Sequence, residues 1–229
     1  MIKTYSKDKR KNIEKLYFLF NKLEKAGFIK EKICDSESLP ILSYRTKKKG
    51  KAIWLIAGIH GEEPAGVNAL AKSIKILIKL GKKYPLIILP LCNPSGYVKN
   101  WRYPLQEKWK KRAKNASVGD SEHYLLNKNM KSRTTHPINL EAKKLTEQTL
   151  KLAKNYPPIF TIDFHEDDII SKGYIYSQGE LGAKDKFAKD IVNVLGKQIP
   201  IKKDEDSRFK EPIINGIIEN TQDGSIDEL

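Results

Sequence analysis

Apolar and polar positions alternate along the chain with helical spacing in some segments and strand-like spacing in others. Helical spacing predicts helices over 8–26, from residue 64 through Leu80 with Gly81 as terminator, and at about 139–154 and 184–196. Strands are predicted at 40–46, 52–58, 85–91, 159–164, 173–177 and 213–219. This order indicates an α/β fold with a mixed, mostly parallel central sheet and helices on both faces.

The length of 229 residues suits one domain rather than two. We expect a single domain over 1–229, in which residues 1–50 form an N-terminal helix and a first strand, and residues 51–224 form the core. The run from Ala52 to Gly58 is apolar on both faces, as in the central strand of a covered sheet. The turn-like Asn93-Pro94-Ser95-Gly96 closes the next strand, and residues 97–137 are expected to be irregular.

Polar or ionisable side chains lie where four predicted strands end. His60, Asn93 and His165 each follow a strand, and Glu219 is the last residue of another. In α/β sheets the ligand site lies beyond the carboxyl ends of the strands. We therefore expect these four side chains to gather at one edge of one sheet.

Three of these positions have the chemistry of a zinc site. A catalytic zinc takes three protein ligands, commonly imidazoles and a carboxylate, and keeps one position for water. His60 and Glu63 are separated by two residues, so on the first turn of a helix both can face one ion, with His165 as the third ligand. Glu62 competes with Glu63, but its spacing from His60 is wrong by one residue. The alternative is that both histidines are hydrogen-bonded structural residues.

Glu219 is the candidate for a general base beside the metal. Glu219 ends an apolar run, so we expect it to project into a partly desolvated pocket, where the pKa of a carboxylate rises into a useful range. A Glu that merely begins a surface loop is the alternative. The other two histidines, His123 and His136, fall in the irregular segment and suit solvent or substrate better than a metal.

Charge and composition narrow the function further. The net charge of +15 comes from 43 basic and 28 acidic residues, yet only six of the basic residues are arginine, which nucleic-acid readers favour for bidentate contacts. Aromatic and basic residues interleave over 97–103 and 108–112, so a nucleic-acid-binding module remains a different-class alternative.

The distribution of apolar residues also predicts the cellular compartment of the protein. No apolar run approaches the roughly 20 residues that span a bilayer. The N-terminal segment also lacks the apolar stretch of a secretory signal, which predicts a cytoplasmic protein with no membrane partner. Cys34 and Cys92 lie beside apolar runs and are expected to be buried thiols.

Three segments together resemble the zinc carboxypeptidase (carboxypeptidase A-like) superfamily, which includes the succinylglutamate desuccinylase and aspartoacylase branch. Residues 58–66, Gly-Ile-His-Gly-Glu-Glu-Pro-Ala-Gly, look like its first metal motif. Residues 93–97, Asn-Pro-Ser-Gly-Tyr, are similar to its Asn-Pro-Asp-Gly turn, and Asp163-Phe164-His165 is similar to its strand-end histidine. The resembling elements run from about residue 51 to 224.

The resemblance implies roles for individual residues. His60, Glu63 and His165 would hold one zinc ion, and Glu219 would take a proton from the zinc-bound water. Trp101-Arg102 resembles the segment whose arginine polarises the scissile carbonyl, which would make Arg102 the group that stabilises the oxyanion.

One departure concerns substrate recognition. The family's Asn-Arg pair, which grips the substrate carboxylate, has no counterpart in residues 119–124. Recognition would then fall to Arg112, Arg133, a lysine or His123, with Asn93 as a further substrate-binding candidate, or would be absent.

The function expected from these features is a zinc-dependent metallocarboxypeptidase that cleaves an amide bond in peptides or peptide-like substrates through a metal-activated water. A zinc amidase that deacylates N-acyl amino acids is the alternative, because it would share the fold and the metal. A metal-free scaffold that has lost activity is another. The substrate, the oligomeric state and the choice of zinc over another divalent ion stay open, although two imidazoles and a carboxylate suit zinc best.

Overall fold

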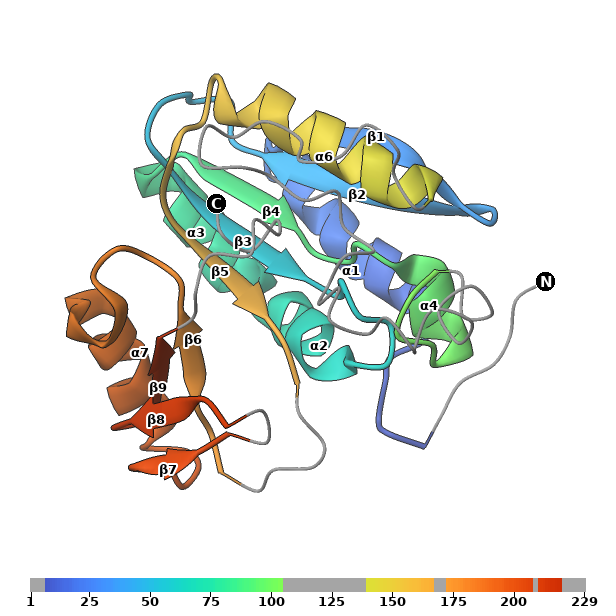
Figure 1. The fold of residues 1–229 in the computed structure, drawn as a ribbon. Helices are drawn as coiled ribbons and strands as arrows, with labels where there is room; N and C mark the ends of the chain where they lie inside the picture. Colours follow the sequence, from blue (N-terminus) through green and yellow to red (C-terminus); the bar gives the residue numbers. More distant parts are fainter. Residues whose placement is uncertain (1–6, 105–138, 167–171, 208–209, 220–229) are drawn as a thin grey trace. The chain divides into compact units, whose positions relative to one another are not determined.

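The computed structural model describes residues 7–104, 139–166, 172–207 and 210–219 (Figure 1). The chain falls into two compact units, one up to Glu166 and one from Asp167 to Asp223. Each unit has its own sheet.

A five-stranded mixed sheet forms the centre of the first unit, in the order β1-β2-β4-β3-β5. The strands are β1 (Ile29–Ser36), β2 (Leu39–Arg45), β3 (Ala52–Ala57), β4 (Leu86–Leu89) and β5 (Pro158–Phe164). β3 pairs in parallel with β4 and β5, whereas β2 pairs antiparallel with β1 and β4. The α/β class and the mixed sheet are confirmed. Strand β1 was not predicted. With β1 included, two of the four strand pairings in this sheet are antiparallel, so the sheet is less parallel than expected.

Helices cover both faces of this sheet, as expected (Figure 1). They are α1 (Ile13–Lys25), α2 (Pro64–Lys72), α3 (Ile74–Lys83), α4 (Pro94–Lys99) and α6 (Leu140–Ala153). Successive strand residues point to opposite faces. Ile53 and Leu55 of β3 accordingly join the core formed with α1, α2 and α3, while Trp54 and Ile56 join the core formed with α6. This explains why β3 is apolar throughout.

Helix α1 shows how local sequence and packing agree. The side chain of Asn12 accepts a hydrogen bond from the backbone N–H of Lys15 and caps the helix start. Its buried residues lie on one helical face: Ile13, Leu16, Phe20 and Leu23. Burying each of these side chains stabilises the folded state by about 1.5–3 kcal/mol.

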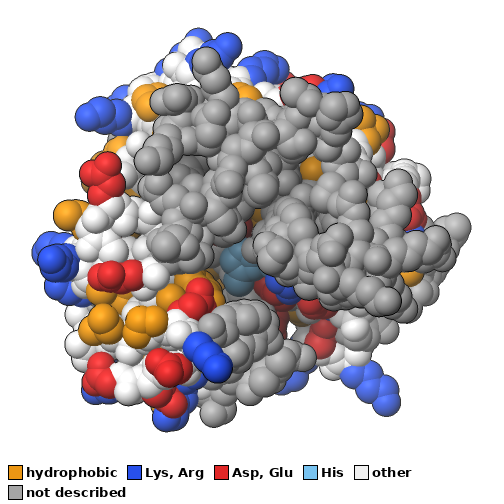
Figure 2. Space-filling model, in the orientation of Figure 1, with side chains coloured by type: hydrophobic (Ala, Val, Ile, Leu, Met, Phe, Trp, Pro, Cys, Tyr) orange, Lys and Arg blue, Asp and Glu red, His pale blue; other side chains and the backbone are white. Residues whose placement is uncertain are grey.

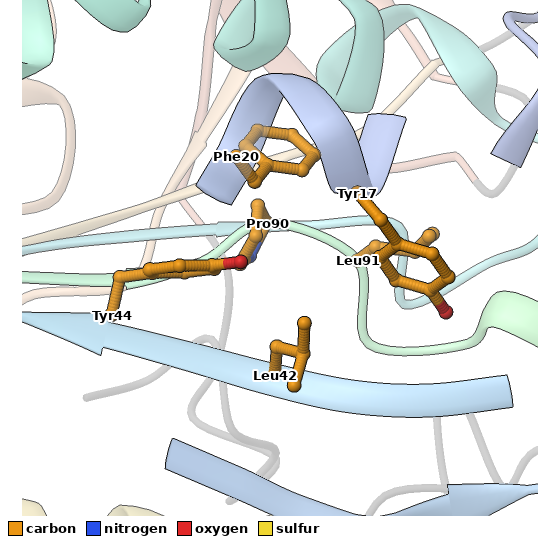
Figure 3. Close-up of a pocket in the computed structure, with 6 residues that line it drawn as sticks. All are labelled: Tyr17, Phe20, Leu42, Tyr44, Pro90 and Leu91. Atoms are coloured by element: carbon orange, nitrogen blue, oxygen red, sulfur yellow. The ribbon is translucent and has the colours of Figure 1, made fainter. Parts of the chain in front are cut away.

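The packing under α1 leaves one small cavity (Figure 3). It is lined by Tyr17, Phe20, Leu42, Tyr44, Pro90 and Leu91. Its volume of about 10 Å³ holds no more than a single water, so it is a packing defect and not a substrate site.

Two predicted segments take a different form. The single helix expected from residue 64 to Leu80 is two helices that meet at Ser73, and the second continues past Gly81 to Lys83. The expected turn at Asn93 is the start of the short helix α4, with Asn93 as its N-cap and Asn100 in the left-handed conformation at its end. Asn and Pro are as typical of helix starts as of turns, which is why the sequence alone does not separate them.

The second unit contains β6 (Ile175–Ser177), the 3₁₀ helix η2 (Gly182–Lys184), α7 (Lys186–Leu195), β7 (Glu205–Asp206), β8 (Pro212–Ile214) and β9 (Ile217–Glu219). Its sheet has the order β6-β9-β8-β7. Ala188 and Val192 of α7 pack on Ile217.

The strand expected over 213–219 is wrong in form: it is a hairpin, β8 turning into β9 at Asn215-Gly216, both with positive φ. We expected four side chains at one edge of one sheet: His60, Asn93, His165 and Glu219. This is also wrong, because Glu219 ends β9, and β9 lies in a different sheet from β3, β4 and β5.

Two further expectations concern the whole chain. Among the helices of the described ranges, none is long and apolar enough to cross a membrane. Both cysteines are free thiols; Cys92 is buried and Cys34 is partly buried. Burial raises the pKa of both thiols, that of Cys34 to about 11.

Candidate metal centre

His60 and Glu63 lie in the tight loop that joins β3 to α2. The backbone N–H of Glu63 donates to the carbonyl of His60 at 3.2 Å, and Glu63 is the N-cap residue of α2, with Pro64 following at the helix start. The two side chains are therefore brought together by a turn that precedes the helix rather than by its first turn. Gly61 is required there, since a Cβ would lie 2.1 Å from the backbone carbon of Gly96.

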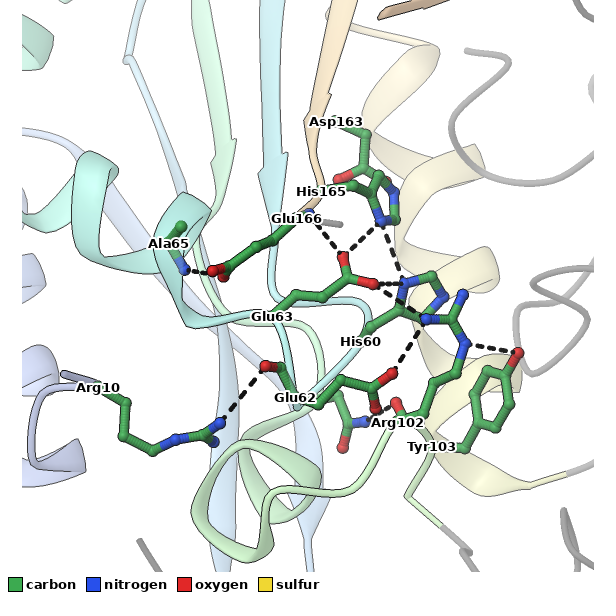
Figure 4. Close-up of polar contacts among 11 residues, drawn as sticks. Arg10, His60, Glu62, Glu63, Ala65, Arg102, Tyr103, Asp163, His165 and Glu166 are labelled. Carbon is green, nitrogen blue, oxygen red and sulfur yellow. Dashed lines mark hydrogen bonds and ion pairs between the residues drawn. The ribbon is translucent and has the colours of Figure 1, made fainter. Parts of the chain in front are cut away.

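His165 completes the cluster from the end of β5 (Figure 4). Its Nδ1 lies 3.0 Å from Oε2 of Glu63 and 3.1 Å from Nδ1 of His60. Nδ1 of His60 in turn lies 2.8 Å from Oε1 of Glu63. One ligand atom from each residue falls within 4.8 Å of the others. The predicted set of three is thus brought together in space.

Burial differs among the three. The side chains of His60 and Glu63 are 2% and 10% exposed, whereas that of His165 is 32% exposed. The cluster therefore has a buried floor and one side open to solvent, which is what an ion with a remaining position for water requires.

Asp163 stands behind His165 on the same face of β5 (Figure 4). Its carboxylate Oδ2 lies 3.1 Å from Nε2 of His165, and its side chain is only 5% exposed. Ligand histidines commonly bind a carboxylate through the ring nitrogen that does not meet the metal, and this fixes the ring. This contact of Asp163 was not predicted, although residues two apart in a strand share a face.

Electrostatics in the cluster favour a charged carboxylate. Burial acts to raise the pKa of Glu63, but hydrogen bonds from His165 and His60 outweigh it, so the pKa is lowered. Burial likewise acts to lower the pKa of His165, and the neighbouring Asp163 and Glu63 carboxylates reverse this and raise it. Glu63 is therefore ionised, while His165 holds its proton more tightly than a free histidine.

Arg102 lies beside the cluster. Its Nη1 donates to Oε1 of Glu63 at 3.0 Å and to Oε1 of Glu62 at 3.1 Å. Burial raises the pKa of Glu62, and the charge of Arg102 opposes this shift without reversing it. Glu62 thus contacts the neighbouring cation, Arg102, in keeping with its spacing from His60. The predicted cation stands next to the predicted ligands.

Asn93 holds the backbone of this arginine in place. Its Nδ2 donates to the carbonyl oxygen of Arg102 at 3.0 Å, and its Oδ1 accepts from the N–H of Gly96 at 2.9 Å. The residue is 2% exposed. These contacts favour a positioning role for Asn93; its predicted contact with substrate stays a prediction.

The remaining predicted site residues belong to the second unit or lie outside the described residues. Glu219 ends β9, and its Oε1 accepts from the N–H of Ala183 in the second unit at 2.9 Å. Arg112, His123 and Arg133 lie outside the described residues. Glu166 was not predicted: its N–H donates to Glu63 and its carboxylate accepts from the N–H of Ala65, at 3.0 and 2.9 Å.

The donor set fits zinc. Two imidazoles and one carboxylate are the ligands of many catalytic zinc sites, and Ca²⁺ or Mg²⁺ would require oxygen-rich sites instead. Within the described ranges, His60, Glu63 and His165 form the group of histidine, cysteine or acidic residues close enough to share an ion. Two of the three have a neighbour that holds them: Glu63 accepts from the N–H of Glu166, and His165 lies against the carboxylate of Asp163.

Several solved structures are similar to this chain in fold. A putative metallopeptidase structure from Shewanella amazonensis is similar, with a TM-score of 0.78 and 25% identity over 95% of this chain and 79% of that one. One from Shewanella baltica has a TM-score of 0.75 and 21% identity over 95% and 78%. Bovine thrombin-activatable fibrinolysis inhibitor has a TM-score of 0.52 and 20% identity over 81% and 73%.

A search of curated proteins gives no match. The family model described as zinc carboxypeptidase matches residues 32–227, most of the chain. The chain therefore belongs to the zinc carboxypeptidase family, whose members are zinc-dependent hydrolases.

Proposed function

We propose that the protein is a zinc metallocarboxypeptidase that cleaves a C-terminal residue from peptides or peptide-like substrates. The observation that carries this proposal is the convergence of His60, Glu63 and His165 with Arg102 next to them. Zinc, when bound there, would polarise the scissile carbonyl and lower the pKa of a bound water towards about 7.

Arg102 would stabilise the charge that develops on the carbonyl oxygen. A fixed cation in a partly buried site needs little reorganisation when that charge forms. Its side chain is held by Glu62 and Glu63 on one side, and its Nε donates to the hydroxyl of Tyr103 at 3.2 Å. Replacing Arg102 by methionine should lower kcat by about 10²–10³-fold.

Glu219 would act as the general base that removes a proton from the attacking water. This role comes from the family resemblance, since Glu219 follows His165 along the chain and stands at the end of a strand. Glu219→Gln keeps the size of the side chain and removes its basicity. Its kcat should fall by about 10²–10⁴-fold while zinc binding stays intact.

Substrate recognition would require a cation for the C-terminal carboxylate. Arg112, Arg133 and His123 are the candidates, because the family's Asn-Arg pair is missing from residues 119–124. A peptide with an amidated C-terminus should then be a much poorer substrate than the same peptide with a free carboxylate.

The test is an incubation of the zinc-loaded protein with a defined peptide pool and with a panel of N-acyl amino acids, followed by mass spectrometry. Ordered loss of C-terminal residues, abolished in Glu219→Gln, supports the proposal. Release of acyl groups alone would replace it with the amidase alternative. Turnover of neither substrate class by a zinc-replete protein would contradict both.

A further inference from the structure

Arg10 is a charged residue enclosed by the first unit, in the segment just before α1. Its side chain has no exposed surface. Removing a guanidinium from water is costly unless its N–H groups and its charge are satisfied. The position of Arg10 therefore depends on the groups that surround it.

These groups come from three segments. Asp8 forms an ion pair with the guanidinium. Nη1 donates to the carbonyl of Gly61 at 3.0 Å and to the carbonyl of Tyr97, and Nη2 donates to Oδ1 of Asn100 at 2.6 Å. The guanidinium also lies 4.9 Å from the centre of the Tyr97 ring. Arg10 thus connects the loop between the metal ligands with the end of α4.

The loop itself is held on two sides. The N–H of Gly61 donates to the carbonyl of Arg102 at 3.1 Å, while the carbonyl of Gly61 accepts from Arg10. Nη2 of Arg10 also lies 3.4 Å from the carbonyl of Glu62, as drawn in Figure 4. Both peptide groups lie between His60 and Glu63, so their orientation sets the directions in which these two side chains leave the backbone.

We propose that Arg10 is a positioning residue for the metal site: by binding the carbonyls of Gly61 and Glu62, it fixes the loop so that His60 and Glu63 converge. It is not one of the three predicted ligands, and it acts through the loop that carries two of them. The inference rests on the proposed zinc site, and it adds a contribution from a residue about 50 positions away along the chain.

The chemistry of this position requires arginine. The planar guanidinium has five N–H donors in a fixed fork and can serve several acceptors at once, whereas a lysine ammonium is a compact charge on a flexible stem. Arg10→Lys keeps the charge and loses most of the fork. Arg10→Met keeps much of the apolar length and loses every donor.

The experiment compares zinc dissociation constants of the full chain, by competition with a chromophoric chelator, after circular dichroism has shown that each variant is folded. Outer contacts of metal sites are worth about 10–100-fold in affinity, so Arg10→Met should weaken zinc binding about tenfold or more. Arg10→Lys should lie between Arg10→Met and the wild type.

Arg45→Met is the matched control. Arg45, the last residue of β2, forms its ion pair with Glu31 of the neighbouring strand β1 and not with the metal loop. Its loss should leave zinc affinity within about threefold of the wild type, and thermal unfolding in excess chelator should report any general loss of stability separately.

A folded Arg10→Met that binds zinc within about threefold of the wild type would overturn the inference, as would an equal loss in Arg45→Met. If Arg10→Met does not fold, Arg10→Lys and Asn100→Gly decide by the same threshold. Glycine tolerates the left-handed backbone of residue 100 and removes the Oδ1 that accepts from Arg10. Absence of zinc binding in the wild type would instead refute the metal site itself.

Discussion

His165 is the residue at which the charges of the site meet. Its Nδ1 faces Glu63 and its Nε2 faces Asp163, at 3.0 and 3.1 Å. The two carboxylates raise its pKa against the opposing effect of burial. Because an imidazole must be neutral to bind a metal, protons and zinc compete at this ring.

Zinc affinity should therefore increase with pH across and above the ordinary histidine range near 6.5. Below the raised pKa of His165 the ring is protonated and binding releases one proton, so the affinity should rise by about tenfold per pH unit. Glu63, whose pKa is lowered, stays ionised and adds no dependence. Chelator competition between pH 6 and 8 measures the slope, and a flat profile would refute this description of His165.

The convergence of His60, Glu63 and His165 was predictable at this scale, because an i, i+3 pair and a strand-end histidine are visible in one dimension. The contacts of Arg10, Asp163 and Glu166 were not predicted. Their partners come from segments that only folding brings together, and an arginine before a helix looks like any solvated basic residue.

At the scale of elements, two asparagines cap the starts of helices, but only one of them also contacts the candidate site. Asn93 caps α4 and also binds the carbonyl of Arg102, whereas Asn139 caps α6 through the N–H of Ala142 at 2.7 Å. Losing an Asn cap costs about 0.5–2 kcal/mol. The two residues therefore separate helix capping from support of the site.

Asn93→Ala and Asn139→Ala should each lower the free energy of unfolding by about 1 kcal/mol. Only Asn93→Ala should also lower kcat, because Arg102 loses a backbone anchor. Urea unfolding and steady-state kinetics on both variants test this. Equal kinetic losses in the two would show that Arg102 does not depend on Asn93.

The β8–β9 hairpin was predicted as a single strand from its apolar pattern. The apolar run from Ile213 to Ile218 resembles one strand, yet Asn215-Gly216 is a strong two-residue hairpin signal that outweighs it. Gly216 has φ +83, and a Cβ there would lie 2.4 Å from Cγ2 of Ile201. The turn depends on this glycine.

Gly216→Ala should destabilise the second unit by about 2 kcal/mol, from left-handed strain and from the contact with Ile201. Gly179→Ala is the control, since nothing lies within 4 Å of its added Cβ. Hydrogen exchange of residues 172–207 reports the loss. Similar exchange in both variants would contradict the strained turn.

At the scale of the whole molecule, the sequence carries a surplus of basic charge, with a formal net charge of +15. On the face drawn in Figure 2, Lys and Arg side chains are interspersed with Asp and Glu. Such a surface suits solvated lysines better than a track for nucleic acid, which gathers cations along one groove. Net charge therefore says little about the activity.

The fold class was predictable because alternating helices and strands leave few architectures. Membership of β9 in a second sheet was not, since a three-residue strand carries the same local signal in either sheet. Glu219 therefore ends a strand of the second sheet, and its proposed role depends on the family resemblance.

The central claim is that His60, Glu63 and His165 hold one catalytic zinc, and the most direct measurement is zinc content. Elemental analysis would follow zinc supplementation and desalting of the wild type, His60→Ala and His136→Ala, the last a histidine not assigned to the site. We predict about one zinc per chain for the wild type and His136→Ala, and close to none for His60→Ala. A zinc-free wild type, or full zinc content in His60→Ala, would contradict the claim.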